Sequence, residues 1–158
     1  MTPLTWEQAR ALPLAIALAE AGNLPITGIS HTQARLLAAA AGGRLPTSQE
    51  WEWMAGGGKR RYPWGDTGPD DRHANLRGLG PERATPVGAY PHGATPDGLL
   101  DVAGNVWEWT ATPRPGQGVV IRGGSYNSIT MYAHCAYIND VPAALASPGI
   151  GVRVVRDP

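Results

Sequence analysis

The sequence has few of the side chains from which disulfides, metal clusters and nucleic-acid interfaces are built. Its 158 residues include one Cys, no Phe and a single Lys among 13 basic residues, which 13 acidic residues balance. One Cys excludes an intrachain disulfide and a zinc site made of several thiolates. The zero formal charge gives little support to nucleic-acid binding, which needs a basic surface. The four His residues lack the close spacing of a helical metal site.

The sequence also lacks an apolar run that could span a bilayer, which takes about 20 residues. Its longest run, 11–19, is interrupted by Pro13 and followed by Glu20. The run resembles the apolar part of a secretory signal, but Glu7 and Arg10 precede it instead of a basic cluster. We therefore expect a helix of the mature protein here, and secretion by another route stays open.

The elements that the sequence predicts are helices first and strands later. Hydroxyl residues followed three positions later by Gln or Glu form capping-box patterns at Thr5/Gln8, Ser30/Gln33 and Thr47/Glu50. These patterns predict helices that end near residues 22, 42 and 55. Short β-branched or turn-bounded segments predict strands at 25–29, 86–90, 106–111, 119–122 and 151–155. This order indicates an α+β fold in one domain, 1–158, with 1–24 as a helical N-terminal extension.

Six Trp residues in a chain without Phe indicate a core filled by large aromatic side chains. Trp107 and Trp109 are two apart on a predicted strand, so they share a face. Trp51 and Trp53 are two apart on a predicted helix, so they diverge. The sequence therefore predicts that the strand pair packs together and that the helix pair does not.

Two carboxylates seven residues apart, Asp101 and Glu108, enclose Gly104 and Asn105. Glycine lets backbone carbonyls turn inward, so this run could surround a hard cation, and calcium is the ion that oxygen ligands favour. A turn capped by Asp101 and Asn105, with Glu108 bound to backbone amides, explains the same residues equally well. From the residues alone both interpretations stay open.

Seven motifs in collinear order resemble the formylglycine-generating-enzyme (sulfatase-modifying factor) family. They are Arg44-Leu45-Pro46-Thr47 with Glu50-Trp51-Glu52, Tyr62-Pro63-Trp64-Gly65, Ala74-Asn75, Thr85-Pro86-Val87-Gly88, the run from Gly98-Leu99 to Trp109, Arg122-Gly123-Gly124-Ser125-Tyr126 and Gly151-Val152-Arg153. The resemblance extends from about Pro25 to Val155, and the order of the motifs makes it specific. It implies a variant of the C-type lectin fold, in which helices flank short twisted antiparallel sheets and long loops.

The resemblance also implies a calcium site. In the calcium-binding members of the family, the positions that match Asp101 and Glu108 supply side-chain oxygens to one ion. Those that match Gly104 and Val106 supply carbonyl oxygens to the same ion. Structural calcium at these four residues is thus the one cofactor that the resemblance implies, and no cofactor is required by the predicted function.

The catalytic residues of the family do not carry over to this chain. Its oxidase members hold copper with two Cys residues, and the matching positions are Ser128 and Ala133, which cannot be thiolate ligands. Cys135 is two residues out of register and has no partner Cys. The His positions also fail to reproduce the iron-binding triad of the sulfoxide-synthase relatives. We therefore expect no enzyme, with a degenerate or unusual oxidase acting on a peptide cysteine as the alternative.

Within this fold, the chain is similar to the variable proteins of diversity-generating retroelements. These carry diversified residues between an R-G-G-S-[WY] strand and a terminal G-[FV]-R strand. Adenine-directed mutagenesis of their Asn codons cannot yield Trp, Met, Gln, Lys or Glu. Residues 1–125 contain 19 residues of these types, whereas 126–150 contain only Met131. At the upstream frequency about four would be expected, so the deficit favours diversification over a loop that happens to be uncharged.

The segment 126–150 also lacks helical or strand periodicity and mixes Tyr, Asn, Ser and Asp, as recognition surfaces do. We predict a variable ligand-binding surface formed by Tyr126, Asn127, Ser128, Ile129, Tyr132, His134, Tyr137, Asn139, Asp140, Leu145 and Ser147. The expected ligand is a protein or glycan on a cell surface, and neither nucleic acid nor membrane insertion is expected. Display on a virion or a cell is favoured over a cytoplasmic location. A structural accessory domain is a third hypothesis.

Overall fold

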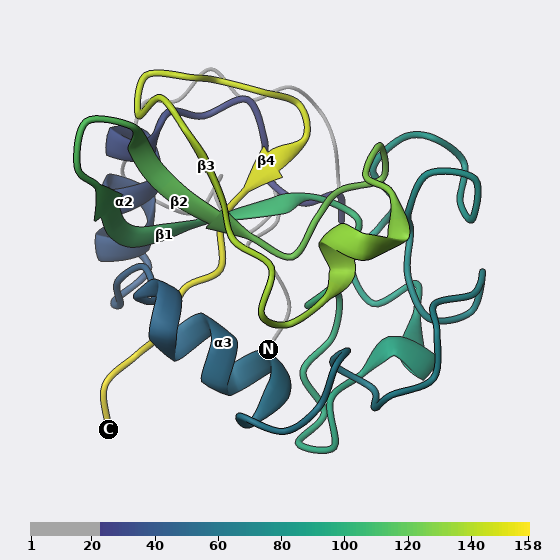
Figure 1. Cartoon of the computed structure of the whole chain (residues 1–158). Coiled ribbons are helices and arrows are strands. Elements are labelled where there is room, and N and C mark those ends of the chain that lie inside the picture. Colours follow the sequence, from purple (N-terminus) through teal and green to yellow (C-terminus); the bar gives the residue numbers. More distant parts are fainter. Residues whose placement is uncertain (1–22) are drawn as a thin grey trace.

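The computed structural model describes residues 23–158, so the first predicted helix and most of the predicted extension lie outside the described residues. Both described α-helices precede the strands, which confirms the α+β class. In chain order the elements are α2 (His31–Ala40), α3 (Ser48–Gly56), the 3-10 helix η1 (Pro91–Gly93), β1 (Trp107–Arg114), β2 (Gly118–Arg122), the 3-10 helix η2 (Thr130–Ala133), β3 (Asn139–Val141) and β4 (Ile150–Gly151) (Figure 1).

Both α-helices begin at capping boxes that the sequence predicts. The Ser30 hydroxyl accepts the Gln33 N–H at 3.3 Å, and the Gln33 side chain accepts the Ser30 N–H at 2.8 Å. Thr47 and Glu50 make the same reciprocal pair ahead of α3, at 3.1 and 2.8 Å. These bonds satisfy amide groups that the first turn of a helix leaves without partners, so the helix starts are fixed locally.

The sheet has the order β3-β2-β1-β4. β1 and β2 form an antiparallel hairpin with Trp109 opposite Ile121, which confirms the strands predicted at 106–111 and 119–122. β3 pairs antiparallel with β2, and β4 pairs parallel with β1, with Ile150 opposite Trp107. The chain after β2 therefore supplies both edges of the sheet, and the residues between these edge strands lie over it.

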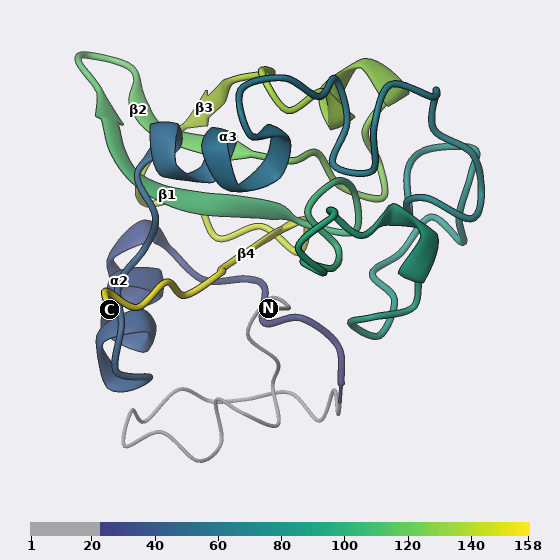
Figure 2. The ribbon, with the colours of Figure 1, turned by 90° about the horizontal axis from the view of Figure 1, so that it is seen from below.

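The two helices pack against opposite faces of the sheet (Figure 2). Trp107 and Trp109 lie in the cluster that includes Leu37 of α2, so they share a face as predicted. Trp51 of α3 packs in a separate cluster with Val102 and other buried residues. Since the strand side chains alternate between faces, the hairpin holds an aromatic layer on the α2 side and a polar layer on the α3 side.

Residues 57–106 form long loops, interrupted by η1, beside the sheet (Figure 1). Two buried asparagines hold them: Asn75 donates to the Arg83 carbonyl at 2.8 Å, and the Asn105 side chain accepts the Thr85 N–H at 2.9 Å. Gly104, at φ 74°, packs so closely that an added Cβ would lie 2.6 Å from the Asn75 carbonyl oxygen. Buried polar contacts thus position these loops, and only glycine fits at residue 104.

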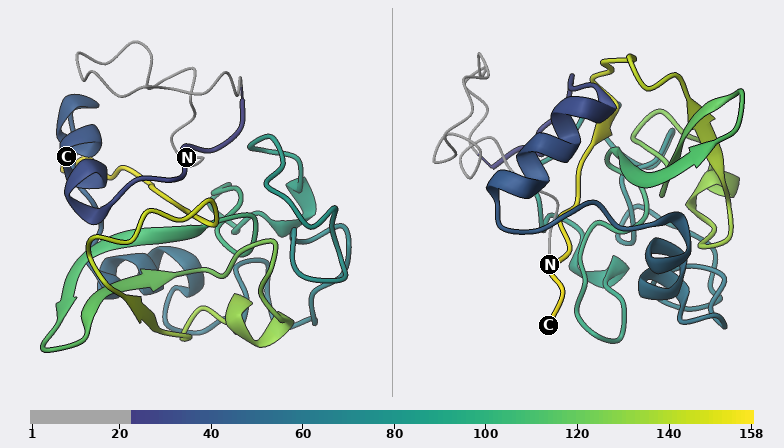
Figure 3. Two further views of the ribbon diagram at one scale, coloured as in Figure 1. Left: turned by 90° about the horizontal axis from the view of Figure 1, so that it is seen from above. Right: turned by 90° about the vertical axis from the view of Figure 1, so that its left-hand side faces the viewer.

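Two predicted strands are wrong and a third is shorter than predicted. Within 25–29 the chain turns at Gly28, φ 70°, and within 86–90 it turns at Gly88, φ 83°, whose N–H donates to Asp101. In both segments a left-handed glycine interrupts the extended run. Of the strand predicted at 151–155, β4 includes only Gly151, while Val155 bridges to Arg44 where the C-terminal residues run past α2 (Figure 3).

Candidate ligand-binding surface

A pocket of about 330 Å³ lies where the segment 126–150 folds back over the sheet. Trp107 and Ile121, both buried strand residues, contribute to its base. The other lining residues are Ser125, Tyr126, Asn127, Asn139, Val141, Leu145, Ser147, Pro148, Gly149 and Ile150. Five residues of the predicted surface therefore meet at one pocket, namely Tyr126, Asn127, Asn139, Leu145 and Ser147.

Exposed apolar side chains concentrate in the same segment. Six large hydrophobic side chains are exposed in the described part of the chain, and four belong to 126–150: Ile129 (43%), Met131 (50%), Ile138 (45%) and Leu145 (39%). Single exposed apolar residues are ordinary on a protein surface, but their concentration in one segment is typical of contact surfaces. The segment thus presents exposed apolar side chains in addition to its pocket.

Two tyrosines of the predicted surface pack between the segment and the core. Tyr132 and Tyr137 stack on each other with centroids 4.5 Å apart, and their rings lie 5.9 and 6.3 Å from Trp107. Both are half-buried and pack against the main core cluster. Burial and the neighbouring Tyr132 raise the pKa of the Tyr137 phenol, so it stays protonated at neutral pH. Packing against the core thus holds both rings in place.

The prediction that Ser128 belongs to the surface is wrong, because its side chain is buried. Its hydroxyl accepts the Ser125 N–H at 2.9 Å, which closes a tight turn after β2. His134 is half-buried, and its Nε2 lies 3.0 Å from the Tyr62 hydroxyl, away from the lining of the pocket. Asp140 is half-buried and forms an ion pair with Arg114 at 2.9 Å.

Backbone hydrogen bonds hold the segment 126–150 on the rest of the protein. Four N–H groups outside the segment donate to its carbonyls at 2.8 to 3.0 Å: Gly28 to Ser147, His31 to Ala143, Arg77 to Ser128 and Trp107 to Gly149. Two N–H groups of the segment donate in return, Tyr126 to Asn105 and Cys135 to Arg61, at 3.0 and 2.9 Å. Each bond uses a main-chain atom of the segment, so it depends little on the side chain at that position.

Arg122, at the end of β2, fixes the middle of the segment in the same manner. Its guanidinium is buried and donates to the carbonyls of Cys135 at 3.2 Å and Tyr137 at 2.7 Å. On the other side it donates to the Ser48 hydroxyl at 3.0 Å and forms an ion pair with Glu52. The planar guanidinium therefore ties α3 to the segment through several directed bonds, which an ammonium group could not reproduce.

The residues at the implied calcium site do not fit the ion. Both oxygens of Glu108 are engaged: Arg153 donates to them at 2.8 and 3.0 Å, and Trp51 donates its Nε1–H at 2.7 Å. Asp101 accepts the Gly88 N–H at 2.6 Å, and burial raises the pKa of its carboxyl. A guanidinium thus already neutralises Glu108. Gly104 and Val106 are buried beside this pair, and no three His, Cys, Asp or Glu side chains in 23–158 could jointly hold a metal.

Cys135 has the surroundings of a structural thiol. It is buried, and an added Cβ on Gly56 of α3 would lie 3.2 Å from its sulfur. Burial raises the pKa of this thiol to about 11, so the thiolate needed for nucleophilic attack or metal ligation is scarce at neutral pH. Ser128 and Ala133, the positions that match the copper-binding cysteines, are both buried.

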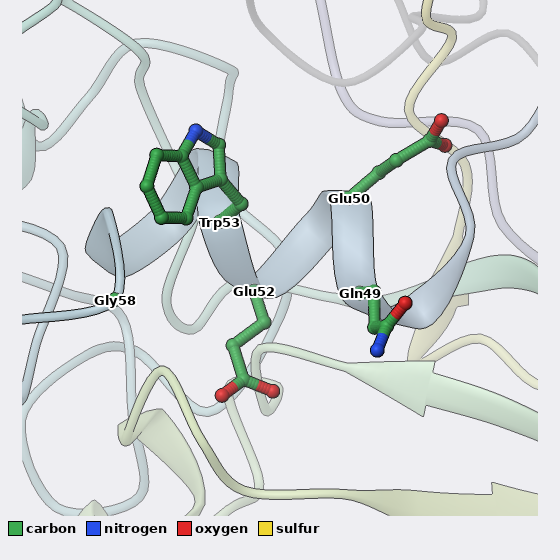
Figure 4. A pocket seen from close by; sticks show the side chains of 5 residues that line it. All are labelled: Gln49, Glu50, Glu52, Trp53 and Gly58. Carbon is green, nitrogen blue, oxygen red and sulfur yellow. The ribbon is translucent and has the colours of Figure 1, made fainter.

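The sequence reasoning missed a second pocket, of about 580 Å³, beside α3 (Figure 4). The Trp53 ring is 71% exposed and projects from the helix there. Its neighbours Glu50 and Glu52 are bound to Arg44 and Arg122, so neither carboxylate is free. The divergence of Trp51 and Trp53 on the helix was the signal, because it placed one of the two rings outside the core.

Comparison with known families and sequences relates the whole chain to one domain type. The model of the "Sulfatase-modifying factor enzyme 1-like domain" matches residues 2–158. The formylglycine-generating enzyme of Streptomyces coelicolor is 37% identical over 171 residues, covering 85% of this chain and 53% of that protein. The hercynine oxygenase of Mycobacterium tuberculosis is 49% identical over 102 residues, covering 61% of this chain and 24% of that protein. The chain thus spans from a quarter to half the length of these relatives.

Solved structures share the fold at low sequence identity. Treponema denticola variable protein 1 superimposes with a TM-score of 0.74 at 19% identity, over 96% of this chain and 80% of that one. The Major Tropism Determinant U1 variant gives a TM-score of 0.58 at 17% identity, over 81% and 37%. The C-type lectin variant expected from the sequence is thereby confirmed as the fold. No helix among the described residues is long and apolar enough to cross a membrane.

Proposed function

The chain belongs to the family of sulfatase-modifying factor enzyme 1-like domains, and we propose that it is a non-enzymatic member that binds a ligand with a diversified surface. The exposed and half-buried side chains of residues 126–150 form this surface, and the remaining motifs form the scaffold that presents it. The proposed ligand is a protein or glycan displayed on a cell.

The way in which the scaffold holds this segment carries the proposal. Arg122 and the scaffold amides bind main-chain atoms of 126–150. A segment anchored through its backbone tolerates exchange of its outward side chains, because the anchoring groups are the same for nearly every residue type. A surface that must accept many sequences needs this separation between folding and recognition.

The chemistry of the surface suits recognition of a macromolecule. The pocket combines the aromatic Trp107 and Tyr126 with the amides of Asn127 and Asn139. Aromatic side chains provide large contact area with little loss of rotamer entropy, and amides provide adaptable hydrogen bonds. Exposed Ile and Met side chains of the same segment add apolar contact area. The surface can thus bind through shape and polar contacts without a cofactor.

Nothing at the positions of the family's copper ligands favours the oxidase alternative. Ser128 and Ala133 carry no thiol, and the raised pKa of Cys135 keeps its buried sulfur protonated. The family's oxidases use two Cys ligands for this reaction, and the sequence contains a single Cys.

The proposed source of the diversity is a diversity-generating retroelement. The near absence of Trp, Met, Gln, Lys and Glu from 126–150 supports it, since adenine-directed mutagenesis of Asn codons cannot produce them. The fold shared with proteins named as a variable protein and a tropism determinant is compatible with this origin. Display on a virion or a cell surface follows as part of the proposal.

Sequencing of this gene from many individuals of one source population tests the proposal. We expect substitutions concentrated at adenine-derived codons between Tyr126 and Ile150, with the Arg122 and Arg153 motifs unchanged. Substitutions spread evenly and sparsely along the gene would overturn it. A fixed segment would favour the structural accessory domain, and that hypothesis predicts no loss of partner when Asn127, Tyr132, Tyr137 and Asn139 are all replaced by Ala.

A further inference from the structure

A third pocket, of about 500 Å³, lies between the turn that follows α3 and the residues that follow η2. Its lining residues are Lys59, Arg60, Arg61, Asp66, His134 and Ala136. Five of these six side chains are charged or titratable, in contrast to the largely apolar base of the pocket over the sheet. The lining includes Lys59, the single Lys of the chain.

Three successive basic residues give this pocket an unbalanced positive charge. Lys59, Arg60 and Arg61 form no ion pair with any residue of 23–158, whereas several other arginines of this part do. Asp66 is the one acidic lining residue, and it accepts the backbone N–H of Arg61 at 2.9 Å. Three cations therefore face one carboxylate, which leaves two positive charges without a counter-charge.

The pocket is built and does not depend on flexible side chains alone. Arg60 donates to the carbonyls of Ala55 at 3.1 Å and Pro63 at 3.2 Å, so its guanidinium is held in place. The Cys135 N–H donates to the Arg61 carbonyl at 2.9 Å, which ties the two walls together. His134 is fixed by the Tyr62 hydroxyl, so the opposite wall is also ordered.

We propose that this pocket binds the anionic group of a charged saccharide, a sulfate, phosphate or carboxylate on a sugar. Guanidinium and ammonium groups recognise such oxyanions through charge-assisted hydrogen bonds, and the fork of Arg61 suits two oxygens at once. The polar lining, with one methyl group from Ala136, favours a sugar over an apolar peptide side chain.

The inference rests on the proposed function for one point, that residues 126–150 vary. His134 and Ala136 belong to that segment, whereas the three cations precede it. Diversification would thus alter the rim of the pocket and leave its charge constant. The surface would combine a fixed site for an anion with a variable site, the pocket over the sheet, that selects the rest of the ligand.

The test uses titration by nuclear magnetic resonance with a sulfated disaccharide and its unsulfated counterpart. We expect the sulfated sugar to shift the amide signals of Arg61 and Ala136, and the unsulfated sugar to shift neither. Lys59→Gln with Arg61→Gln should weaken binding roughly tenfold or more, since each lost cation removes a charge-assisted hydrogen bond. Arg35→Gln with Arg83→Gln removes the same charge at other exposed positions and should change the affinity less than about twofold.

Three results would overturn the proposal: no shift with the sulfated sugar or with its phosphorylated and carboxylated counterparts, equal losses in the two double variants, or binding of an acidic Asp/Glu peptide in place of the sugar. Equal losses would mean attraction by net charge alone. These results are independent of population sequencing. Variation in 126–150 without sugar binding would overturn this inference and leave the proposed function intact. Sugar binding without variation would overturn the proposed function and leave the anion site intact.

Discussion

Trp51 and Trp53 lie two residues apart on α3 and have opposite surroundings. Trp51 is fully buried and donates to the Glu108 carboxylate at 2.7 Å, whereas Trp53 is 71% exposed. We expect Trp51→Phe to lower the free energy of unfolding by about 2 to 3 kcal/mol, because a buried carboxylate loses a donor. Trp53→Phe should change it by less than about 0.5 kcal/mol. Urea denaturation of both variants measures this, and equal losses would contradict the assignment of Trp51 to the scaffold.

Glu108 also decides what calcium does to the protein. Because Arg153 and Trp51 occupy both of its oxygens, an ion would have to displace a buried guanidinium. An ion that binds only the native state would raise the melting temperature by mass action. We expect the melting temperature to be the same, within about 1 °C, in millimolar calcium and in excess chelator. A rise of several degrees in calcium would mean that Arg153 gives way and that the site implied by the family is real.

The orientation of the side chains in 126–150 could not be predicted from the residue types alone. The mixture of residue types in this segment indicated a recognition surface, and five of its predicted members do line one pocket. The types do not show which residues turn inward. Ser128 is buried by a tight turn on Ser125, and Tyr132 stacks under Tyr137, because the backbone path and not a period of 2 or 3.6 sets their directions.

At the scale of elements, the last residue of β2, Arg122, fixes the position of the segment 126–150. Arg122→Lys replaces a planar fork with one ammonium, which cannot reach Ser48 and the carbonyls of Cys135 and Tyr137 together. We expect faster amide hydrogen exchange between residues 131 and 141 and a loss of about 3 kcal/mol in unfolding free energy.

The matched control for this substitution is Arg114→Lys at the other end of the hairpin. Arg114 is exposed and makes a single ion pair with Asp140, so the loss should be below about 0.5 kcal/mol. Unchanged exchange in Arg122→Lys would show that the Arg122 guanidinium does not hold the segment, and this part of the anchoring would have to be abandoned.

The elements that sequence predicted best are those with local causes. The capping boxes at Ser30 and Thr47 need only residues three apart, and both helices begin there. The β1–β2 hairpin follows from the alternation of Trp107 and Trp109 with polar residues and from the β-branched run 119–121. The segments 25–29 and 86–90 also look extended, but contacts distant in sequence, such as Gly88 with Asp101, bend them. The parallel pairing of β4 with β1 is likewise set by the packing of the whole chain.

At the scale of the whole molecule, the family motifs and the segment 126–150 have different tasks. Arg153 donates to Glu108, Arg122 donates to Ser48 of α3, and all three charged side chains are buried. Asn75 and Asn105 fix the long loops. Between the motifs at Arg122 and Arg153 lies the segment, which is bound by backbone hydrogen bonds and by a few buried side chains such as Ala133 and Cys135. The contacts that stabilise the fold therefore lie mainly in the motifs, and these could be recognised in the sequence. The identity of the ligand depends on the segment and could not be predicted.

This division predicts that the surface can be changed without unfolding the protein. Replacing the exposed Ile129, Met131, Ile138 and Leu145 together by Ser should lower the unfolding free energy by no more than about 1 kcal/mol per site, because each side chain keeps only part of its area buried. Leu37→Ala in α2, a single buried change, should cost about 2 to 5 kcal/mol. Urea denaturation compares the two, and retention on a hydrophobic column should fall in the fourfold variant alone. A loss of about 2 kcal/mol or more per site in that variant would place its side chains in the core, and a protein built so could not carry a diversified surface there.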